Sequence, residues 1–285
     1  MLAQNPGRGN AALLAMATLD AKGQLGEVWG IERKGETMTK RALITGGQQG
    51  IGLGIATALS DAGYRIVIAA EVPELSDTVQ AALARLGPDT QYVQHDLQAI
   101  ADIPRTMAAI GEITTFVSNA GVPSPVRGDM LALTPANFDH VMAVNLRGGF
   151  FLAQAVARQF LQSRSDHYRC LCFVTSVSAV MASVERADYC ISKAGAAMMS
   201  QLYAARLAAD GIGVYELRPG IIDTAMTAGV HEAYTARIAA GLVPARRWGQ
   251  PSDVGSVVVP LAEGALASAT GCAISVDGGL SLARL

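Results

Sequence analysis

The sequence predicts an α/β fold of one domain, in which helices cover both faces of a doubly wound parallel sheet. From Arg41 onward, short runs rich in β-branched residues alternate with helical segments, which is the pattern of that fold. The first run, Ala42-Leu43-Ile44, leads into a glycine-rich turn and then into an amphipathic helix from Leu53 to Ala62. With 285 residues, 51% of them hydrophobic, the chain is long enough to bury one core of this kind.

Composition excludes several classes of function. A net charge of -2 gives no reason to expect nucleic acid or an anionic membrane as a partner. No apolar run reaches the roughly 18 residues of a membrane helix. The cysteines show neither paired CxxC spacing nor a nearby histidine, so we expect buried free thiols, no metal site and a reducing cytoplasm. They are Cys170, Cys172, Cys190 and Cys272.

Residues 1–37 differ in composition from the rest of the chain. They are rich in Gly, Ala, Gln and Asn, and their one apolar run, Ala11 to Ala17, is short. A secretory signal is not indicated there, because neither a basic start nor a cleavage site is convincing. Met38 resembles a natural protein start that runs straight into a strand. We therefore expect residues 1–37 to be a disordered extension, from an over-long gene start or an expression remnant, and residues 38–285 to be the folded domain. A targeting or partner-binding arm is the alternative.

The glycine-rich turn predicts a nucleotide cofactor. It reads Thr45-Gly46-Gly47-Gln48-Gln49-Gly50-Ile51-Gly52 and lies between a strand and a helix. Glycines there let the backbone approach a pyrophosphate, and the helix N-terminus supplies unpaired N–H groups and a positive dipole end. We expect contacts from Gly46, Gln49, Gly50, Ile51 and Gly52.

The second strand, Arg65 to Ala69, is followed by Ala70-Glu71. An acidic side chain at this point accepts hydrogen bonds from the adenosine ribose, whereas a basic one pairs with a 2′-phosphate. Neither Gln49 nor Glu71 is basic. The sequence therefore favours NAD, with NADP as the alternative, although Glu71 as a plain surface carboxylate stays open.

A tyrosine and a lysine form the strongest candidate for chemistry. Tyr189 and Lys193 are four residues apart, so on a helix their side chains share one face. A tyrosine ordinarily loses its proton near pH ~10, and a neighbouring ammonium group lowers that pKa. Ser176 stands thirteen residues before Tyr189, after the apolar run 170–174 that reads as a buried strand. A hydroxyl there can hydrogen-bond a substrate oxygen while the tyrosine transfers its proton. Alone, Tyr-x-x-x-Lys would indicate an ordinary exposed helical pair.

Together these motifs resemble the short-chain dehydrogenase/reductase family, in the subgroup of 3-oxoacyl-[acyl-carrier-protein] reductase-like proteins. The shared features are the Ser–Tyr–Lys set, the TGxxxGxG form of the glycine turn and the ending TGxxxxVDGG from Thr270 to Gly279. The resemblance covers Thr39 to Leu285. It implies a Rossmann fold, hydride transfer between a nicotinamide and a carbonyl or secondary alcohol, and a homotetramer. It also implies that Asn145, a polar interruption in the expected helix Asn137 to Ala157, joins the catalytic set.

The resemblance implies further cofactor contacts at the ends of later strands. Asp96 matches the family position that contacts the adenine amino group, at the end of an expected strand Tyr92 to Leu97; His95 beside it is expected to be an exposed strand-end residue. Small residues after the fourth strand would let the ribose sit against the backbone. Proline and glycine would turn the chain beneath the nicotinamide, and the residues after them would hold its carboxamide. The expected set is Leu97, Asp96, Asn119, Ala120, Gly121, Pro219, Gly220, Ile222 and Thr224.

The segment from about 225 to 248 has no expected strand and carries an amphipathic stretch, Val230 to Leu242, which fits a lid over the substrate. We expect Ser178 and Arg186 to line the substrate pocket, with Arg186 reading a carboxylate or phosphate. Arg246 and Arg247 are expected to face solvent.

Three functions remain open from the residues. One is a 3-oxoacyl thioester reductase, and the second is an NAD-dependent dehydrogenase of a small polyol, sugar or sugar acid. The third is a cofactor-binding regulator without turnover, which the intact Ser176, Tyr189 and Lys193 disfavour.

Overall fold

The computed structural model describes residues 39–284, and within them a single parallel sheet runs in the order β3-β2-β1-β4-β5-β6-β7. This confirms the predicted doubly wound sheet. The expectation for residues 1–37 lies outside the described residues. The strands are β1 (Arg41–Thr45), β2 (Arg65–Ala70), β3 (Gln91–Gln94), β4 (Thr115–Ser118), β5 (Arg169–Val174), β6 (Ile212–Pro219) and β7 (Ala273–Val276).

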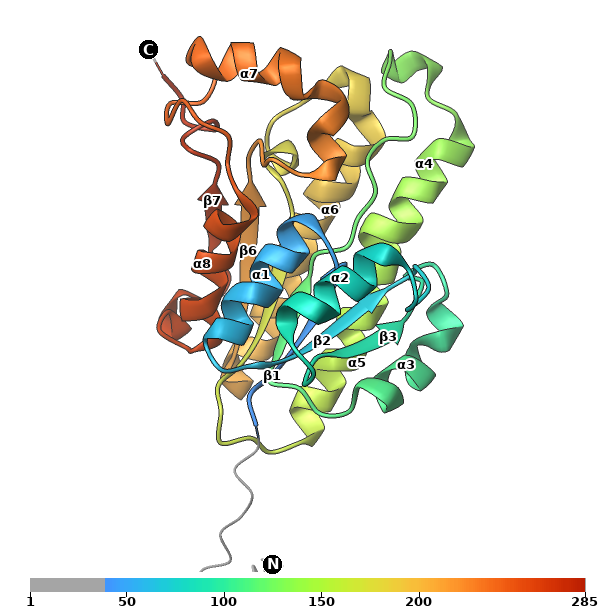
Figure 1. The fold of residues 1–285 in the computed structure, drawn as a ribbon, viewed down its shortest axis with the longest axis vertical. Coiled ribbons are helices and arrows are strands. Elements are labelled where there is room, and N and C mark those ends of the chain that lie inside the picture. Colours follow the sequence, from blue (N-terminus) through green and yellow to red (C-terminus); the bar gives the residue numbers. More distant parts are fainter. Residues whose placement is uncertain (1–38, 285) are drawn as a thin grey trace, which may run out of the picture. The chain divides into compact units, whose positions relative to one another are not determined.

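Helices cover the sheet on both faces (Figure 1). Helices α1, α2 and α8 pack on one face, and α3, α4, α5 and α6 pack on the other. The helices are α1 (Gly50–Asp61), α2 (Asp77–Leu86), α3 (Ile103–Ile110), α4 (Pro135–Met142), α5 (Gly149–Gln162), α6 (Ala187–Leu207), α7 (His231–Ala239) and α8 (Pro251–Ala262). Helix α1 begins within the glycine turn, three residues before the Leu53 start expected from periodicity, so the first turn of α1 carries Gly50 and Gly52.

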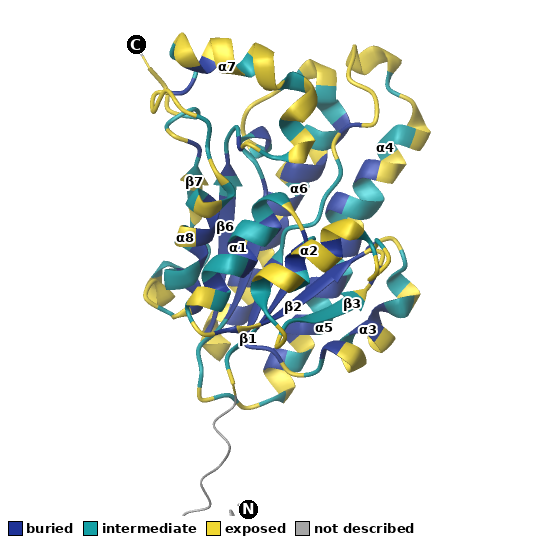
Figure 2. Cartoon of the chain, in the orientation of Figure 1, coloured by how far each residue is buried: buried dark blue, intermediate teal, exposed yellow. Residues whose placement is uncertain are grey.

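The core consists of two apolar layers, one on each face of the sheet. Side chains of a strand point alternately to the two faces, so Phe173 of β5 joins the layer under α5 and α6, while Cys172 joins the layer under α1 and α8. Figure 2 shows β2 and β6 in the dark blue of buried residues. Full burial of one large apolar side chain, such as Phe116, contributes about 1.5–3 kcal/mol. Strands buried on both faces therefore hold the site that forms at their ends.

The third strand is shorter than predicted. It ends at Gln94, so Asp96 lies in the loop after the strand. The expectation that His95 is exposed is wrong, because its side chain is only 5% exposed. The imidazole turns toward α3, where its Nδ1 lies 3.0 Å from Oγ1 of Thr106. Burial lowers the pKa of His95, which keeps the ring neutral at pH 7.

The predicted long helix from Asn137 to Ala157 is helical throughout but changes type at its polar interruption. Helix α4 passes into a π-helical segment, Ala143–Gly148, which passes into α5. A π turn holds an extra residue and is common at functional sites. Here it contains Asn145, which is buried.

The segment expected to form a lid contains α7, preceded by a 3-10 helix at Ala225–Val230. Figure 1 shows α7 beyond the carboxyl ends of β6 and β7. The ring of His231 stacks on Trp248 at 4.5 Å between centroids, and Nε1 of Trp248 donates to Oγ1 of Thr235 at 3.0 Å. These contacts fasten α7 to the chain that follows it.

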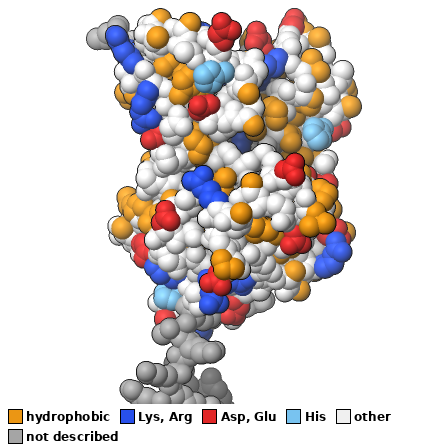
Figure 3. Space-filling model, in the orientation of Figure 1, with side chains coloured by type: hydrophobic (Ala, Val, Ile, Leu, Met, Phe, Trp, Pro, Cys, Tyr) orange, Lys and Arg blue, Asp and Glu red, His pale blue; other side chains and the backbone are white. Residues whose placement is uncertain are grey.

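Surface charges of both signs are mixed on the face drawn in Figure 3. Arg246 is exposed, as expected, and Arg247 is exposed but ion-paired with Asp253 at 2.7 Å. Within residues 39–284, no helix combines the length and apolar character needed to cross a bilayer.

Candidate active site

The glycine turn between β1 and α1 is held by close backbone contacts. Gly46 has φ +67°, a left-handed conformation that favours glycine. A Cβ at Gly52 would lie 2.1 Å from the carbonyl oxygen of Gly46, so no other residue fits there. The first turn of α1 therefore packs directly onto the loop. Its free N–H groups and positive dipole end point to the place where a pyrophosphate would bind.

A cavity of about 320 Å³ lies at the carboxyl ends of the strands, beside this turn. It is the fold's crevice at the topological switch point, since β1 lies between β2 and β4. Most of the expected cofactor residues line it, together with Tyr189 and Lys193: Gly46, Gln49, Gly50, Ile51, Gly52, Glu71, Asp96, Leu97, Asn119, Ala120, Gly121 and Thr224.

Three expected cofactor residues do not line this cavity. Pro219 and Ile222 are buried, and a Cβ at Gly220 would lie 2.7 Å from the Cα of Asp277. The chain from Pro219 to Ile222 therefore packs against the turn after β7 and delivers Thr224 to the cavity wall.

Asn119 joins the ends of β1 and β4. Its Nδ2 donates to the carbonyl of Thr45 at 2.9 Å. In return, Oγ1 of Thr45 accepts from the backbone N–H groups of Asn119 and Ala120, at 2.9 and 3.0 Å. These bonds preorganise the floor of the cavity, because both strand ends are held before any ligand binds.

The end of the cavity near β2 carries an exposed carboxylate, Glu71. Its backbone carbonyl accepts from Nε2 of Gln94 at 2.9 Å, which anchors the loop after the strand. Among residues 39–284, Lys193 is the one Lys or Arg that lines the cavity, and it lies at the opposite end, on α6.

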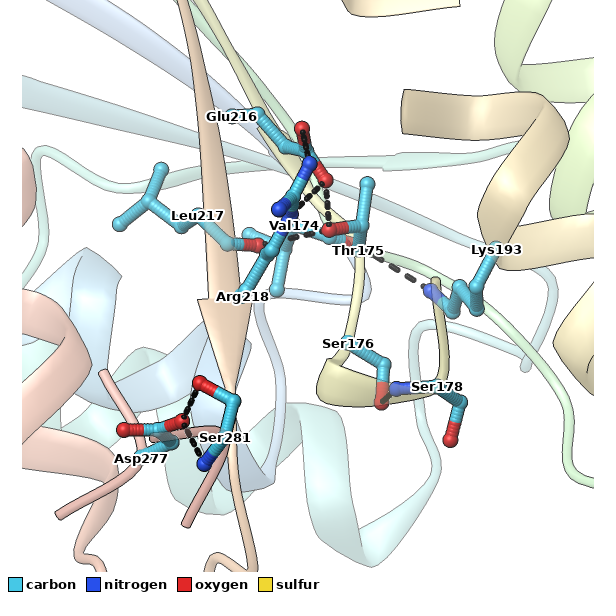
Figure 4. Close-up of polar contacts among 10 residues, drawn as sticks. All are labelled: Val174, Thr175, Ser176, Ser178, Lys193, Glu216, Leu217, Arg218, Asp277 and Ser281. Carbon is cyan, nitrogen blue, oxygen red and sulfur yellow. Dashed lines mark hydrogen bonds and ion pairs between the residues drawn. The ribbon is translucent and has the colours of Figure 1, made fainter. Parts of the chain in front are cut away.

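Tyr189 and Lys193 lie on α6, one turn apart, and meet the end of β5. The lysine is 6% exposed, and its Nζ donates to the carbonyl oxygen of Val174 at 3.1 Å. The same Nζ lies 5.7 Å from the centroid of the Tyr189 ring. Ser176 follows the strand, and its Oγ accepts from the backbone N–H of Ser178 at 3.1 Å. Figure 4 shows Lys193 pointing to the chain just before Ser176.

Burial is the largest influence on the charges of this group. It raises the pKa of Tyr189, and the hydroxyl of Ser176 and the positive charge of Arg186 act in the opposite direction. The expected net lowering of the pKa by Lys193 is thus wrong for the chain by itself. Burial also lowers the pKa of Lys193 to about 8. At pH 7 the tyrosine therefore keeps its proton and the lysine is mostly charged.

The amide of Asn145 is fully used in the π-helical turn. Its Oδ1 accepts from the backbone N–H of Val122 at 2.7 Å, and its Nδ2 donates to the carbonyl of Val122 at 3.0 Å and to Oγ of Ser192 at 3.1 Å. A Cβ at Gly121 would lie 3.1 Å from Oδ1 of Asn145 and 3.6 Å from Nζ of Lys193. Asn145 and Lys193 are therefore close neighbours, with Gly121 between them.

The two expected substrate residues lie between β5 and α6, outside the cavity that holds the cofactor residues. The guanidinium of Arg186 lies 5.6 Å from the centroid of the Tyr189 ring, and its Nη2 is 3.4 Å from Oγ of Ser178. Within residues 39–284, no carboxylate lies at ion-pair distance from Arg186. Arg186 thus brings a positive charge without a carboxylate partner in the described residues to the ring of Tyr189.

Several residues at the site were missed by reasoning from the sequence. Gln48, His140, Val144 and Met226 line the cavity, and Oε1 of Gln48 is buried with no hydrogen-bond partner within the described part of the chain. Glu216 of β6 is buried and accepts a hydrogen bond from Thr175, the residue before Ser176, and an acidic residue in the middle of an apolar run was the available signal.

The cavity fits a dinucleotide cofactor. The turn at Gly46 and Gly52 provides a close backbone approach, Glu71 stands where a ribose hydroxyl would need an acceptor, and Lys193 and Thr224 lie at the other end. In the part of the chain that the structure describes, no group of His, Cys, Asp and Glu residues has the arrangement of a metal site.

Comparisons with known proteins agree with this geometry. The family model described as enoyl-(acyl carrier protein) reductase matches residues 46–281. The chain is 32% identical to 2-dehydro-3-deoxy-D-gluconate 5-dehydrogenase of Escherichia coli over 84% of this chain and 94% of that protein. It is similar, at 47% identity and a TM-score of 0.82, to a 3-oxoacyl-[acyl-carrier protein] reductase of Brucella melitensis in complex with NAD, covering 87% of this chain and 99% of that one.

A further similar structure is a 2-deoxy-D-gluconate 3-dehydrogenase, named as putative, of Agrobacterium tumefaciens with bound NADP. It shares 30% identity and a TM-score of 0.75 with this chain and covers 86% of this chain and 97% of its own. Both nicotinamide cofactors therefore occur among similar structures. On these matches, the chain belongs to the short-chain dehydrogenase/reductase family, in its 3-oxoacyl-[acyl-carrier-protein] reductase-like subgroup, and is an NAD(P)-dependent oxidoreductase of carbonyl and alcohol groups.

Proposed function

We propose that the chain is an NAD-linked reductase of 3-oxoacyl thioesters or similar 3-oxo compounds, with Ser176, Tyr189 and Lys193 as its catalytic residues. The observation that carries the proposal is the meeting of Tyr189 and Lys193 with the end of β5, where Ser176 begins the next segment. The cofactor, when bound, supplies or accepts the hydride at nicotinamide C4.

Each side chain has a separate task in this scheme. Tyr189 gives its hydroxyl proton to the carbonyl oxygen as the carbonyl carbon gains the hydride, and takes a proton back from the alcohol in the reverse direction. Ser176 hydrogen-bonds the same oxygen. Lys193 holds the nicotinamide ribose, and Asn145 supports proton supply to Lys193. Because burial raises the pKa of Tyr189, the tyrosine is protonated at pH 7, which is the form that the reduction step uses.

Tyr189→Phe should reduce turnover at least about 100-fold, since general acid catalysis contributes about 10²–10⁴-fold. The ring that lines the cavity remains, so the NADH dissociation constant should change less than about 2-fold. Stopped-flow oxidation of NADH by a 3-oxo ester and a separate binding titration measure the two effects. Retained turnover would remove Tyr189 from the catalytic set.

We further propose NAD as the preferred cofactor. Glu71 supports this, because its carboxylate lies on the cavity wall near β2 and would repel a 2′-phosphate while accepting from a ribose hydroxyl. Gln49, on the same wall, adds no positive charge. The relative from Brucella melitensis has NAD bound, in agreement with this preference.

Glu71→Gln should reduce the preference for NADH over NADPH by about 10-fold, the value of one lost charge-assisted contact of about 1.4 kcal/mol. Quenching of the fluorescence of Trp29 and Trp248 during separate titrations gives both dissociation constants. Glu74→Gln is the matched control, because Glu74 is a nearby exposed carboxylate outside the cavity. Tighter NADPH binding by the unaltered chain would overturn the preference.

A second substrate class, a sugar acid or other small oxo acid, is favoured by Arg186. Its guanidinium lies beside the catalytic tyrosine without a carboxylate partner in residues 39–284. Arginine binds carboxylates in a fixed bidentate geometry, and an acyl thioester has no anionic group close to its reacting carbonyl. The similarity to a 2-dehydro-3-deoxy-D-gluconate dehydrogenase supports the same class.

We also propose that residues 225–248 close over the substrate as a lid.

Arg186→Gln should lower kcat/KM for a small oxo acid by about 10- to 100-fold, because a hydrogen bond to a charged group contributes about 1.5–3 kcal/mol. The uncharged methyl ester of the same oxo acid should lose much less. Arg127→Gln, on an exposed loop, serves as the control. Equal losses of kcat/KM for the acid and the ester would mean that Arg186 acts on Tyr189 instead of on the substrate. The 3-oxoacyl thioester would then remain as the proposed substrate class.

We also propose a cytoplasmic homotetramer. The four cysteines are free, as a reducing compartment requires. Helix α6 and the segment around Phe150 line an apolar groove of about 620 Å³. At its edge, Met198 and Leu202 are 54% and 58% exposed. Exposed apolar side chains on one helix face are what a second copy of the chain would cover.

Leu202→Glu should shift the chain from tetramer towards smaller species, because an unpaired carboxylate in an apolar interface is costly. Sedimentation velocity gives the mass directly. Leu75→Glu is the control, since Leu75 is 85% exposed and lies away from the groove. A monomeric unaltered chain would contradict the proposal.

A further inference from the structure

Glu216 is an acidic residue in the middle of the sheet. It lies on β6 between Phe173 of β5 and Ala273 of β7, and it is 1% exposed. Strands buried on both faces of a parallel sheet are normally apolar. A carboxylate there is costly unless its oxygens are paired and hydrogen-bonded. The partners of Glu216 therefore indicate why it is present.

One partner is Arg218, two residues further along the same strand and on the same face. Its Nε and Nη2 donate to the two carboxylate oxygens of Glu216 at 2.7 and 2.8 Å. This bidentate pairing fixes the carboxylate in one orientation. A buried ion pair is weak support for stability, because apolar side chains of similar volume serve a core as well or better. The pair must be explained by something other than stability.

The other partner is Thr175, the residue before Ser176. Its Oγ1 donates to Oε1 of Glu216 at 2.7 Å and lies 3.1 Å from the carbonyl oxygen of Leu217. Its backbone N–H donates to the same carbonyl at 2.8 Å. Both the side-chain hydroxyl and the backbone N–H of Thr175 are thus hydrogen-bonded to β6. Figure 4 shows Thr175 and Arg218 meeting at Glu216, with Ser176 continuing from Thr175.

Three successive residues at the end of β5 are consequently held from three directions. Lys193 binds the carbonyl of Val174, β6 holds Thr175, and the N–H of Ser178 binds Oγ of Ser176. Reacting groups must be aligned closely, and a displacement of about 1 Å at a catalytic group costs about 100-fold in rate.

We propose that Glu216 is a positioning residue for Ser176: oriented by Arg218, its carboxylate holds the hydroxyl of Thr175 and so sets where the serine hydroxyl meets the substrate oxygen. The inference rests on the proposed catalytic role of Ser176. It extends the site to Glu216 and Arg218, which do not line the cofactor cavity, through Thr175, which does.

Thr175→Val removes the hydroxyl and keeps the shape of the side chain. We expect kcat to fall about 10-fold, with the NADH dissociation constant within about 2-fold, and Thr175→Ser to restore kcat. The decisive measurement is a double-mutant cycle with Ser176→Ala, followed by single-turnover oxidation of NADH. If Thr175 acts through Ser176, Thr175→Val causes no further loss once the serine hydroxyl is gone. Equal losses in both backgrounds, or a matching loss of NADH affinity, would overturn the proposal.

A second variant tests Glu216 itself. Glu216→Leu combined with Arg218→Met replaces the ion pair by apolar side chains, which should leave the thermal midpoint unchanged or raised. It should still lower kcat about as much as Thr175→Val. An unchanged kcat in this folded variant would overturn the proposal, and if the variant does not fold, the Thr175 cycle decides.

The controls separate this inference from the assignment beneath it. Ser200→Ala removes a buried hydroxyl of α6 that has no hydrogen-bond partner within residues 39–284, and it should leave kcat unchanged. Ser176→Ala alone should lower kcat by at least about 10-fold. If it does not, the catalytic role of Ser176 is wrong and the inference falls with it. If it does and the cycle is additive, only the positioning role of Glu216 is wrong.

Discussion

The site depends on one constraint: the carboxyl ends of parallel strands carry backbone groups that the sheet no longer pairs, and short polar side chains must hold them. Thr45 and Asn119 do this between β1 and β4. Thr175 does it between β5 and β6, with Glu216 behind it. Ser176, which has a proposed chemical task, directly follows Thr175, and Lys193 donates to the carbonyl of Val174 just before it. The apolar strands form a rigid core, and the polar side chains at their ends fix the positions of the backbone groups that surround the site.

Burial is the main influence on the charge states of Tyr189 and Lys193. Tyr189 and Lys193 are both shifted towards their neutral forms, because a low-dielectric surrounding disfavours charge of either sign. The positive charge of Arg186 partly offsets this for the tyrosine. A proton donor at pH 7 results, rather than a ready phenolate.

The expectations that failed have a common cause. A strand prediction from apolar residues could not see that β3 ends at Gln94, because its end is set by where β2 stops offering a partner. His95 was misjudged since its burial comes from α3, a segment that is close in space through the fold. Pro219, Gly220 and Ile222 match motif positions and stay predicted cofactor contacts; in the structure they do not line the cavity, Gly220 packs against Asp277, and Thr224 lies on the cavity wall.

Local patterns in the sequence determined the fold class, the glycine turn and the pairing of Tyr189 with Lys193, because each depends on spacing within one or two elements. Periodicity predicts a strand or a helix face, and glycines in the sequence predict a turn whose backbone conformation other residues rarely adopt. The tertiary structure alone decided that Glu216 meets Thr175, that Arg186 lies beside Tyr189 without a carboxylate partner in the described chain, and that Asn145 and Lys193 are neighbours. Those contacts join residues some 40 or more positions apart in two of the three cases. Such contacts arise from how the elements pack, and burial then sets the pKa values of the groups that meet there.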